Sequence, residues 1–430
     1  MMNSRAGLLP SLLLAVLLPL VVLGSSGCGR GTSTPKNEVW TRQFGTSDSD
    51  DFVFAAVADG SGNIYVTGGT YNPLKADAFI IKCDVSGNEI WTSQFGTSLD
   101  DFAFAVVADG SGNIYVAGGT DGTFPGQLSS VGFDPFVAKY DASGNEIWTR
   151  QFGQSESDVV RAMVADEAGN IYMAGGTGEY AGQRTYLGSG VENADDTFFT
   201  KYDASGNEVW TRQFGSDRPD LVYAMVADGS GNIYMAGGTE GDLPGQTSSG
   251  GVDAFIAKYD TSGNEMWTRQ FGTGDFDIVR AMVADGSGNI CVAGGTEGTF
   301  PGQTSSGGVD AFIAEYDASG NEIAMRQFGN LVNRYSYVMV ADAVGNMYVA
   351  NTVDEYPSSF LSCLSCGMAH DATNSHVLLT KYDTFGKEVW AGKFATDHWD
   401  TASEIVAEGS GDIYVAGKTG GDVFIMKLRD

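Results

Sequence analysis

The chain repeats a pattern of four short apolar runs that are separated by Gly, Asn, Asp and Ser. In the unit after Phe214 the runs are LVYAMVAD (221–228), NIYMAGGT (232–239), DAFIAKYD (253–260) and EMWTRQFG (265–272). In DAFIAKYD, large apolar residues alternate with small or polar ones, which is the period of a strand, and the run is too short for a helix. The Gly-Asn and Gly-Ser pairs between the runs are typical of tight hairpins. The pattern therefore predicts four antiparallel strands per unit, which we name A to D.

Seven such units follow one another along the chain. The Trp of strand D marks each unit except one, and the marker positions are Trp40, Trp91, Trp148, Trp210, Trp267, Ala324 and Trp390. Since a sheet of four antiparallel strands is one propeller blade, the pattern predicts an all-β, seven-bladed β-propeller over residues 38–430. The first run of this region, EVWTRQFG (38–45), is a strand D, and the last, DVFIMKLRD (422–430), is a strand C. We therefore expect the N-terminal strand to complete the last blade and close the ring.

The stretch GGVDAFIAKYDTSGNEMWTRQFG (250–272) resembles the bacterial SBBP β-propeller repeat, and the hairpin VADGSGNIYVAGG (107–119) is similar to NHL-type blades. The resemblance extends over nearly all of the chain after Asn37 and implies the propeller fold. It implies no particular activity, because propellers serve lyases, hydrolases, dehydrogenases and binding scaffolds alike.

The N-terminus has the composition of an export signal. Residues 1–27 contain one Arg and an apolar run from Leu8 to Leu23, which is shorter than the ~20 residues of a membrane-spanning helix. The ending SSGC resembles a bacterial lipoprotein processing site, which implies that Cys28 is lipidated and that residues 28–37 form a polar tether. Ordinary signal cleavage and an uncleaved anchor stay open as alternatives. We expect an extracytoplasmic, lipid-anchored monomer in a bacterial cell envelope, with the membrane as one partner.

The charge balance narrows the choice of partners. With 54 acidic and 24 basic residues, the formal net charge is −30. Binding to a polyanion draws its affinity from Lys and Arg, so this composition argues against nucleic acid as a ligand.

Two sets of acidic residues recur from unit to unit. Strand A begins at Asp51, Asp101, Asp158, Asp220, Asp277, Arg334 and Asp400, and strand C begins at Asp77, Asp134, Asp196, Asp253, Asp310, His376 and Asp422. The strand directions place both sets on one face of the ring, the first of them near the mouth of the central channel. Converging carboxylates would suit Ca²⁺, which takes 6–8 oxygen ligands. The simpler interpretation is that each Asp accepts backbone N–H groups of the adjacent turn.

The B-to-C loops lie on the same predicted face. Three of them, DGTFPGQLSSVGF (121–133), EGDLPGQTSSGGV (240–252) and EGTFPGQTSSGGV (297–309), offer Phe, Pro, Gln and Ser for recognition. Loops on a rigid scaffold commonly carry binding sites. A loop that is typical of the family and binds nothing is the alternative.

The sixth unit departs from the others, with Ala324 for Trp, Arg334 and His376 for Asp, and an insertion over residues 351–376. The insertion contains Cys363, Cys366, His370 and His376, residue types that bind zinc and other soft metals at such spacing. Outside the cytosol a Cys363–Cys366 disulfide is the simpler outcome, and free thiols are the third. Cys83 and Cys291 occupy slots that are Tyr in sister units, so we expect both to be substituted core residues.

These patterns favour a noncatalytic binding or structural protein whose ligand would be a cell-surface glycan or a protein. The alternative is an extracytoplasmic enzyme acting on polysaccharides, a lyase or hydrolase, with acidic groups at the channel mouth. A metal-responsive or redox role for the insertion is a third hypothesis.

Overall fold

The computed structural model describes residues 38–429, apart from 46–49, 73, 130–131, 154–157, 178–196, 286–287, 332–336, 343–344, 356–373, 395–399 and 409–410. The chain divides into one unit of Met1–Thr32 and a second of Ser33–Asp430, and the described residues all belong to the second.

The described strands form seven four-stranded antiparallel sheets, as the repeat predicts. Blades one to three are β2 (Asp50–Ala58), β3 (Ile64–Tyr71), β4 (Ala76–Cys83), β5 (Glu89–Phe95); β6 (Asp101–Ala108), β7 (Ile114–Thr120), β8 (Asp134–Tyr140), β9 (Glu146–Gln151); and β10 (Asp158–Ala165), β11 (Ile171–Thr177), β12 (Thr197–Tyr202), β13 (Glu208–Phe214). Blades four to six are β14 (Asp220–Ala227), β15 (Ile233–Thr239), β16 (Asp253–Tyr259), β17 (Glu265–Phe271); β18 (Asp277–Ala284), β19 (Ile290–Thr296), β20 (Val309–Tyr316), β21 (Glu322–Leu331); and β22 (Tyr337–Ala341), β23 (Met347–Glu355), β24 (Asn374–Tyr382), β25 (Glu388–Phe394). Blade seven is β26 (Asp400–Ala407), β27 (Asp412–Thr419), β28 (Asp422–Arg429) and β1 (Glu38–Phe44).

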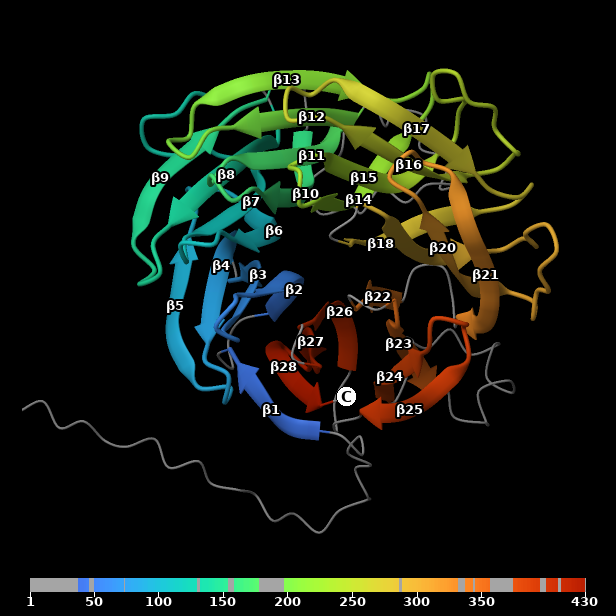
Figure 1. Cartoon of the computed structure of the whole chain (residues 1–430). Coiled ribbons are helices and arrows are strands. Elements are labelled where there is room, and N and C mark those ends of the chain that lie inside the picture. The colour runs from blue at the N-terminus through green and yellow to red at the C-terminus, as the bar shows by residue number, and fades with distance from the viewer. Residues whose placement is uncertain are drawn as a thin grey trace, which may run out of the picture. The chain divides into compact units, whose positions relative to one another are not determined.

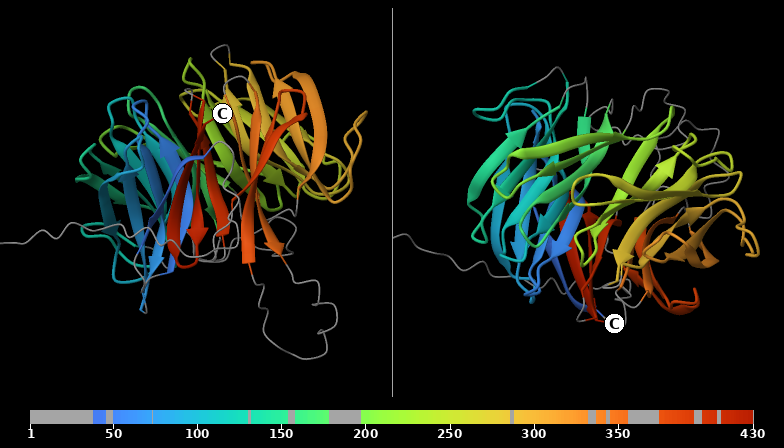
Figure 2. Two further views of the ribbon diagram at one scale, coloured as in Figure 1. Left: turned by 90° about the horizontal axis from the view of Figure 1, so that it is seen from below. Right: turned by 45° about the horizontal axis from the view of Figure 1, so that its top comes forward.

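The seven sheets stand side by side in a closed ring. The A strands, β2, β6, β10, β14, β18, β22 and β26, are innermost, and each contacts the A strand of the next blade, including β26 with β2. Figure 1 looks down this ring, and Figure 2 shows the strands running between its two faces. In the described part of the chain we find no helix long and apolar enough to cross a membrane.

The N-terminal strand closes the ring, as the order of the runs predicts. Strand β1 pairs antiparallel with β28, so the outer edge of blade seven is covered by the start of the chain. Trp40 of β1 is buried and its indole Nε1 donates to the carbonyl of Val85 in blade one, at 3.1 Å. The closing strand therefore fastens blade seven to blade one as well as completing its own sheet.

The hairpins form because one Asp side chain satisfies several donors of the turn. In the C–D hairpin of blade two, Asp141 Oδ1 accepts the backbone N–H groups of Ser143 and Asn145, and Asp141 Oδ2 accepts the Asn145 side chain. Gly144 has a φ of 85°, and a Cβ there would lie 2.9 Å from the Trp91 ring of blade one. The turn therefore requires Gly for its backbone and for the indole packed on it.

A row of three side chains ties each blade to the next. In six blades a Tyr on strand B, a Lys on strand C and a Trp on strand D are cross-strand neighbours; we call each set a Tyr–Lys–Trp row. The rows are Tyr65–Lys82–Trp91, Tyr115–Lys139–Trp148, Tyr172–Lys201–Trp210, Tyr234–Lys258–Trp267, Tyr348–Lys381–Trp390 and Tyr414–Lys427–Trp40.

The Lys of each row lies 4.8–5.2 Å from the centroid of its Tyr ring. In blade four, for example, Lys258 Nζ and Trp267 Nε1 both donate to the carbonyl of Ala318 in the C–D hairpin of blade five, at 3.2 and 3.1 Å. Lys258 Nζ also lies 3.6 Å from Asp228 Oδ2, so the ring face, the carbonyl and this carboxylate together replace the water that the buried ammonium group loses.

Deletion of residues 38–44 should destabilise the whole propeller. It uncovers β28 and removes the buried Trp40, and loss of a buried Trp side chain alone costs about 3–5 kcal/mol. Thermal melts followed by circular dichroism should show a melting temperature at least several degrees lower than that of the intact protein. Deletion of 29–36, the predicted tether, is the control and should have little effect. Equal melting temperatures for the two truncations would contradict the closure model.

Candidate functional site

The Asp residues that begin the A strands are buried, and they accept hydrogen bonds from the turn that precedes them. Their exposed fractions range from 0 to 5%, for Asp51, Asp101, Asp158, Asp220, Asp277 and Asp400. Asp277 Oδ2 accepts the backbone N–H of Thr273 at 2.6 Å and its hydroxyl at 2.8 Å. Ser216 makes the same backbone bond to Asp220 at 2.6 Å, and Thr97 makes it to Asp101 at 2.5 Å. At these three blades the carboxylate caps the D–A link.

The Asp residues that begin the C strands are held by the Gln of the RQF and SQF motifs on strand D. Gln270 Nε2 donates to Asp253 Oδ2 at 2.8 Å. Five such pairs are Gln43–Asp422, Gln94–Asp77, Gln151–Asp134, Gln270–Asp253 and Gln327–Asp310. The repeated Gln is thus a partner of the repeated Asp, a role that the sequence pattern did not suggest.

The two Asp sets meet in pairs at the links between blades. At the link between blades four and five, a Cβ added to Gly272 would lie 2.2 Å from Asp253 Oδ1 and 2.9 Å from Asp277 Oδ2. The Gly of the QFG motif is therefore needed because two carboxylates flank it closely. Asp77 with Asp101, Asp134 with Asp158, and Asp422 with Asp51 flank Gly96, Gly153 and Gly45 in the same way.

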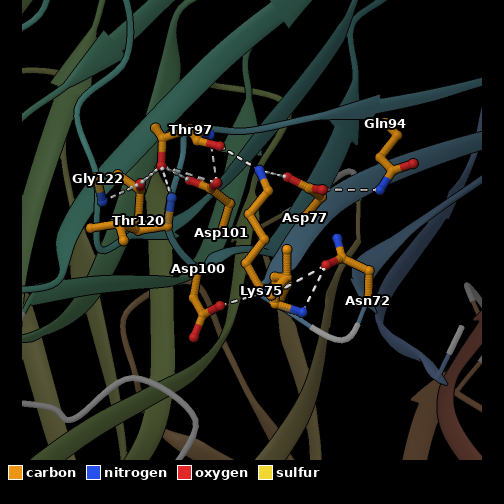
Figure 3. Close-up of polar contacts among 12 residues, drawn as sticks. Asn72, Lys75, Asp77, Gln94, Thr97, Asp100, Asp101, Thr120 and Gly122 are labelled. Atoms are coloured by element: carbon orange, nitrogen blue, oxygen red, sulfur yellow. Dashed lines mark hydrogen bonds and ion pairs between the residues drawn. The ribbon is translucent and has the colours of Figure 1, made fainter.

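One of these links contains a cation of its own. Lys75 Nζ donates to Asp77 and to the carbonyl of Thr97, between the two carboxylates of the link (Figure 3). The Asp101 carboxylate still has a raised pKa, because burial outweighs its hydrogen bonds and the charge of Lys75. At Asp277, burial raises the pKa to about 6, and the charge of Asp253 contributes in the same direction.

This geometry differs from the expected crowding of carboxylates at the channel mouth. At four links the acidic residues lie in pairs, and among the described residues no three His, Cys, Asp or Glu side chains are close enough together to hold a metal ion. The carboxylates lie at separate links between blades and do not form one ring of ligands. The Ca²⁺ site therefore stays a prediction.

Several predicted site residues lie outside the described residues: Cys28, Asp196, Arg334, Cys363, Cys366 and His370. Of the soft-metal set, only His376 is described. It is buried on β24 and pairs with Val353 of β23. Cys83 is fully buried, whereas Cys291 is half-buried, and both are free thiols.

The B-to-C loops of blades two, four and five are anchored by one repeated arrangement. In blade two, Gln151 Oε1 accepts the N–H of Phe124, while Gln151 Nε2 donates to the carbonyl of Gly122 and to Asp134. Gln270 and Gln327 make the equivalent bonds in blades four and five. The anchors Phe124, Leu243 and Phe300 are buried, and the following Pro-Gly tips are exposed. The loops are thus held in one conformation with their tips in solvent.

The sequence pattern missed a set of residues along the central channel. In six blades the A–B register skips one residue of strand A, which is a β-bulge; these bulge residues are Phe54, Phe104, Arg161, Tyr223, Arg280 and Ser403. Neighbouring bulge residues touch from blade to blade. The Phe54 and Phe104 ring centroids are 5.0 Å apart, and the Arg280 guanidinium lies 4.2 Å from the Tyr223 ring centroid. Since the A strands are innermost, these side chains line the channel.

A sequence signal for this set exists. Three residues after each strand-A Asp stands a position that changes between Phe, Arg, Tyr and Ser, while its two neighbours are Val or Ala except for Glu404 in blade seven. Bulges leave a residue outside the ladder, where it can be re-aimed. Variation at this fixed position of the repeat is thus the sequence signal that could have predicted the channel-lining residues.

Comparisons with known proteins agree with the repeat. The model of the SBBP beta-propeller repeat matches residues 39–75, 90–125, 147–179 and 209–244, so each match runs from a strand D into strands A and B of the next blade. The curated Regulatory protein FlaEY of Caulobacter vibrioides is 29% identical over 164 residues, which are 36% of this chain and 17% of that protein.

Two further similarities are more distant. The uncharacterized WD repeat-containing protein L264 of Acanthamoeba polyphaga mimivirus is 23% identical over 188 residues, 36% of this chain and 13% of that protein. The chain thus spans less than a fifth of the length of either curated relative. The crystal structure of polysaccharide lyase Uly1 has a TM-score of 0.50 at 10% identity, over 87% of this chain and 89% of that one. At this identity the similarity concerns the fold alone.

The Asp277→Asn variant should lose a pH dependence that the wild type has. Because the pKa rises from 3.8 to about 6 on folding, the native protein holds a proton that the unfolded chain releases. This contribution is fully present below pH ~4 and is lost as the pH rises through about 6, a change of about 3 kcal/mol. Urea denaturation at pH 4 and pH 7.5 should show the wild type losing about that much stability relative to the variant.

The Asp101→Asn variant is the matched comparison. Burial raises the pKa of Asp101 as well. The difference in unfolding free energy between Asp101→Asn and the wild type should therefore change with pH in the same direction. If the wild type and Asp277→Asn differed in unfolding free energy by the same amount at both pH values, the description of this link as a buried pair of carboxylates would be wrong.

Proposed function

The chain belongs to the SBBP beta-propeller repeat proteins, and we propose that it is a noncatalytic binding protein of the bacterial cell envelope whose ligand is a cell-surface glycan. The proposed contact surface comprises the channel-lining bulge residues and the exposed tips of the three anchored B-to-C loops. The bulge residues and the loop tips both lie toward the face of the ring at which the A and C strands begin.

The chemical variation of the bulge residues is the observation that carries this proposal. A position that served only packing could keep one residue type in nearly every blade, as the Gly, Trp and Asp slots do. Instead the channel presents aromatic rings beside guanidinium groups: Phe54 contacts Phe104, and Arg280 lies over Tyr223. Aromatic faces pack against the apolar faces of sugar rings, and Arg donates a planar fork of hydrogen bonds to oxygen ligands.

The anchored loops support the same proposal. Because the D-strand Gln holds each loop at its base, little conformational entropy is lost when the tip meets a ligand. Leu128 at the tip in blade two is 89% exposed. Preformed loops around a varied channel are the arrangement expected of a rigid recognition surface.

The enzyme alternative receives less support from the site. A general acid or base must reach its substrate. The described strand-A Asp residues are buried, and five strand-C Asp residues are bonded to Gln side chains. Similarity to a polysaccharide lyase at 10% identity concerns the fold alone. We therefore propose binding without bond cleavage.

Substitutions in the channel should weaken glycan binding without unfolding the protein. We expect the purified propeller to bind at least one polysaccharide fraction from bacterial envelopes in isothermal titration calorimetry, and Phe104→Ala and Arg280→Gln each to weaken that binding at least tenfold, about 1.4 kcal/mol. Chromatography of the glycan after incubation should show an unchanged chain length.

The control for this experiment is Val209→Ser, at an exposed position of strand D in blade three. It should leave both the affinity and the melting temperature unchanged. Binding that survives both channel substitutions would place the contact surface elsewhere, and shortened glycan chains would favour the enzyme.

The envelope location rests on the N-terminal sequence. Cys28→Ala should remove the lipid acceptor, so the protein should move from the membrane pellet to the soluble fraction when cells are fractionated and probed with an antibody. A mature wild-type chain that begins at a residue other than Cys28, found by mass spectrometry, would exclude the lipid anchor.

A further inference from the structure

Blade five lacks the whole Tyr–Lys–Trp row that the other six blades have. Cys291 pairs with Glu315 across strands β19 and β20, and Glu315 pairs with Ala324 across β20 and β21. In blade four the same positions hold Tyr234, Lys258 and Trp267. Three large side chains that reach toward the next blade are thus replaced together by smaller ones without an N–H donor.

The change alters the seam between blades five and six. In the seam before it, the Trp267 ring covers Gly320, where a Cβ would lie 2.8 Å from the indole. At the matching Gly386 of blade six, Phe328 occupies this place, with its ring 2.4 Å from an added Cβ. Phe328 packs on Tyr382 at 4.8 Å between ring centroids. The phenylalanine at the end of strand D has therefore taken over the contact that the missing Trp would make.

Blade six carries two further substitutions on the side that faces blade five. Leu378 stands where blade five has Phe312, against which Phe271 of blade four packs at 6.0 Å. Asn351 stands where the other six blades have Gly, at Gly68, Gly118, Gly175, Gly237, Gly294 and Gly417. In those blades a Cβ would lie 1.7–1.9 Å from a strand-A carbonyl oxygen. In blade six, β22 pairs with β23 over Tyr337–Ala341 without the bulge, so Tyr337 is the partner of Asn351.

These changes leave a pocket of about 430 Å³ in the seam. Its lining is Gly329, Asn351, Leu378, Thr380, Tyr382, Gly386, Glu388 and Ala391. The volume falls within the ~300–1,000 Å³ typical of small-molecule sites. Asn351 is only 6% exposed, and its Oδ1 has no hydrogen-bond partner among the described residues. A buried acceptor without a donor is costly, so this wall of the pocket favours a ligand with an N–H or O–H group.

We propose that the pocket between blades five and six binds a small aromatic heterocycle with an N–H donor, of the size and chemistry of indole. The ring lies beside Leu378, Tyr382 and Ala391, and its N–H donates to Asn351 Oδ1. The ring fills the space beside Leu378 that Phe271 and Phe312 fill in the seam before it, because Phe328 lies over Gly386 instead. Glu388 at the exposed rim disfavours anionic ligands, so indole and tryptamine bind more tightly than indole-3-acetate.

Titration of the purified propeller with indole tests the proposal, followed by ligand-observed NMR and calorimetry. We expect a Kd on the order of 100 μM for the wild type. Ala324→Trp competes with Phe328 for the place over Gly386, so Phe328 should move into the space beside Leu378 and abolish indole binding. Asn351→Gly restores the sister residue and removes the acceptor, and it should weaken binding at least tenfold. Glu388→Gln should reduce the preference for indole over indole-3-acetate.

The matched control is Phe385→Ser, in the same hairpin at a side chain that is 75% exposed. It should bind indole like the wild type. Asn351→Gly keeps the test valid if Ala324→Trp does not fold, because Gly is the residue of six other blades. The proposal is overturned if the wild type does not bind 5 mM indole, or if Asn351→Gly binds it as tightly as the wild type.

Discussion

The buried lysine of the Tyr–Lys–Trp row is the interaction on which the ring depends. An ammonium group at the edge of a blade must be satisfied after it loses water. In blade four a Tyr ring face, a backbone carbonyl of the next blade and the Asp228 carboxylate do so, and in blade seven Lys427 pairs with Asp412 at 2.7 Å. The carbonyl, that of Ala318, belongs to a hairpin whose shape is set by Asp317 and Gly320, so hairpin, Lys and Trp form one contact between blades. A ring needs this contact at nearly every seam, which explains why the unit is repeated with so few changes.

Acidic residues play two opposite electrostatic roles on this scaffold. In the exposed hairpins, hydrogen bonds from the Asn side chain and from backbone N–H groups hold the pKa of Asp84 and of Asp141 below the usual range. At the links, burial raises the pKa of Asp101 and Asp277 instead. The hairpin carboxylates remain ionised and keep the surface acidic. Asp101 and Asp277 are retained at a cost in stability near neutral pH, because they cap the turns that lead from one blade to the next.

The residues that depart from the repeat lie at two places that could accommodate a ligand. The bulge residues vary along the channel, and blade five exchanges its row for Cys291, Glu315 and Ala324. The two kinds of departure differ in origin. The channel residues lie outside the A–B ladder, so they can change without disturbing the pairing of the strands. The row residues hold a seam together, so their loss leaves a pocket that needs an occupant or costs packing energy.

The sequence by itself determined the number of blades, the strand order and the closing strand. Each of these follows from local turn chemistry and from a period that is visible in the printed letters, with EVWTRQF at the start and DVFIMKLR at the end. The tertiary structure alone decided which Asp meets which, since Asp253 and Asp277 belong to different blades and meet only through the link. It also decided that the Gln of strand D anchors the loops and that the bulge residues line the channel. Those relations depend on how one blade packs against the next, and no local pattern specifies the distance between two strands that are far apart in the chain.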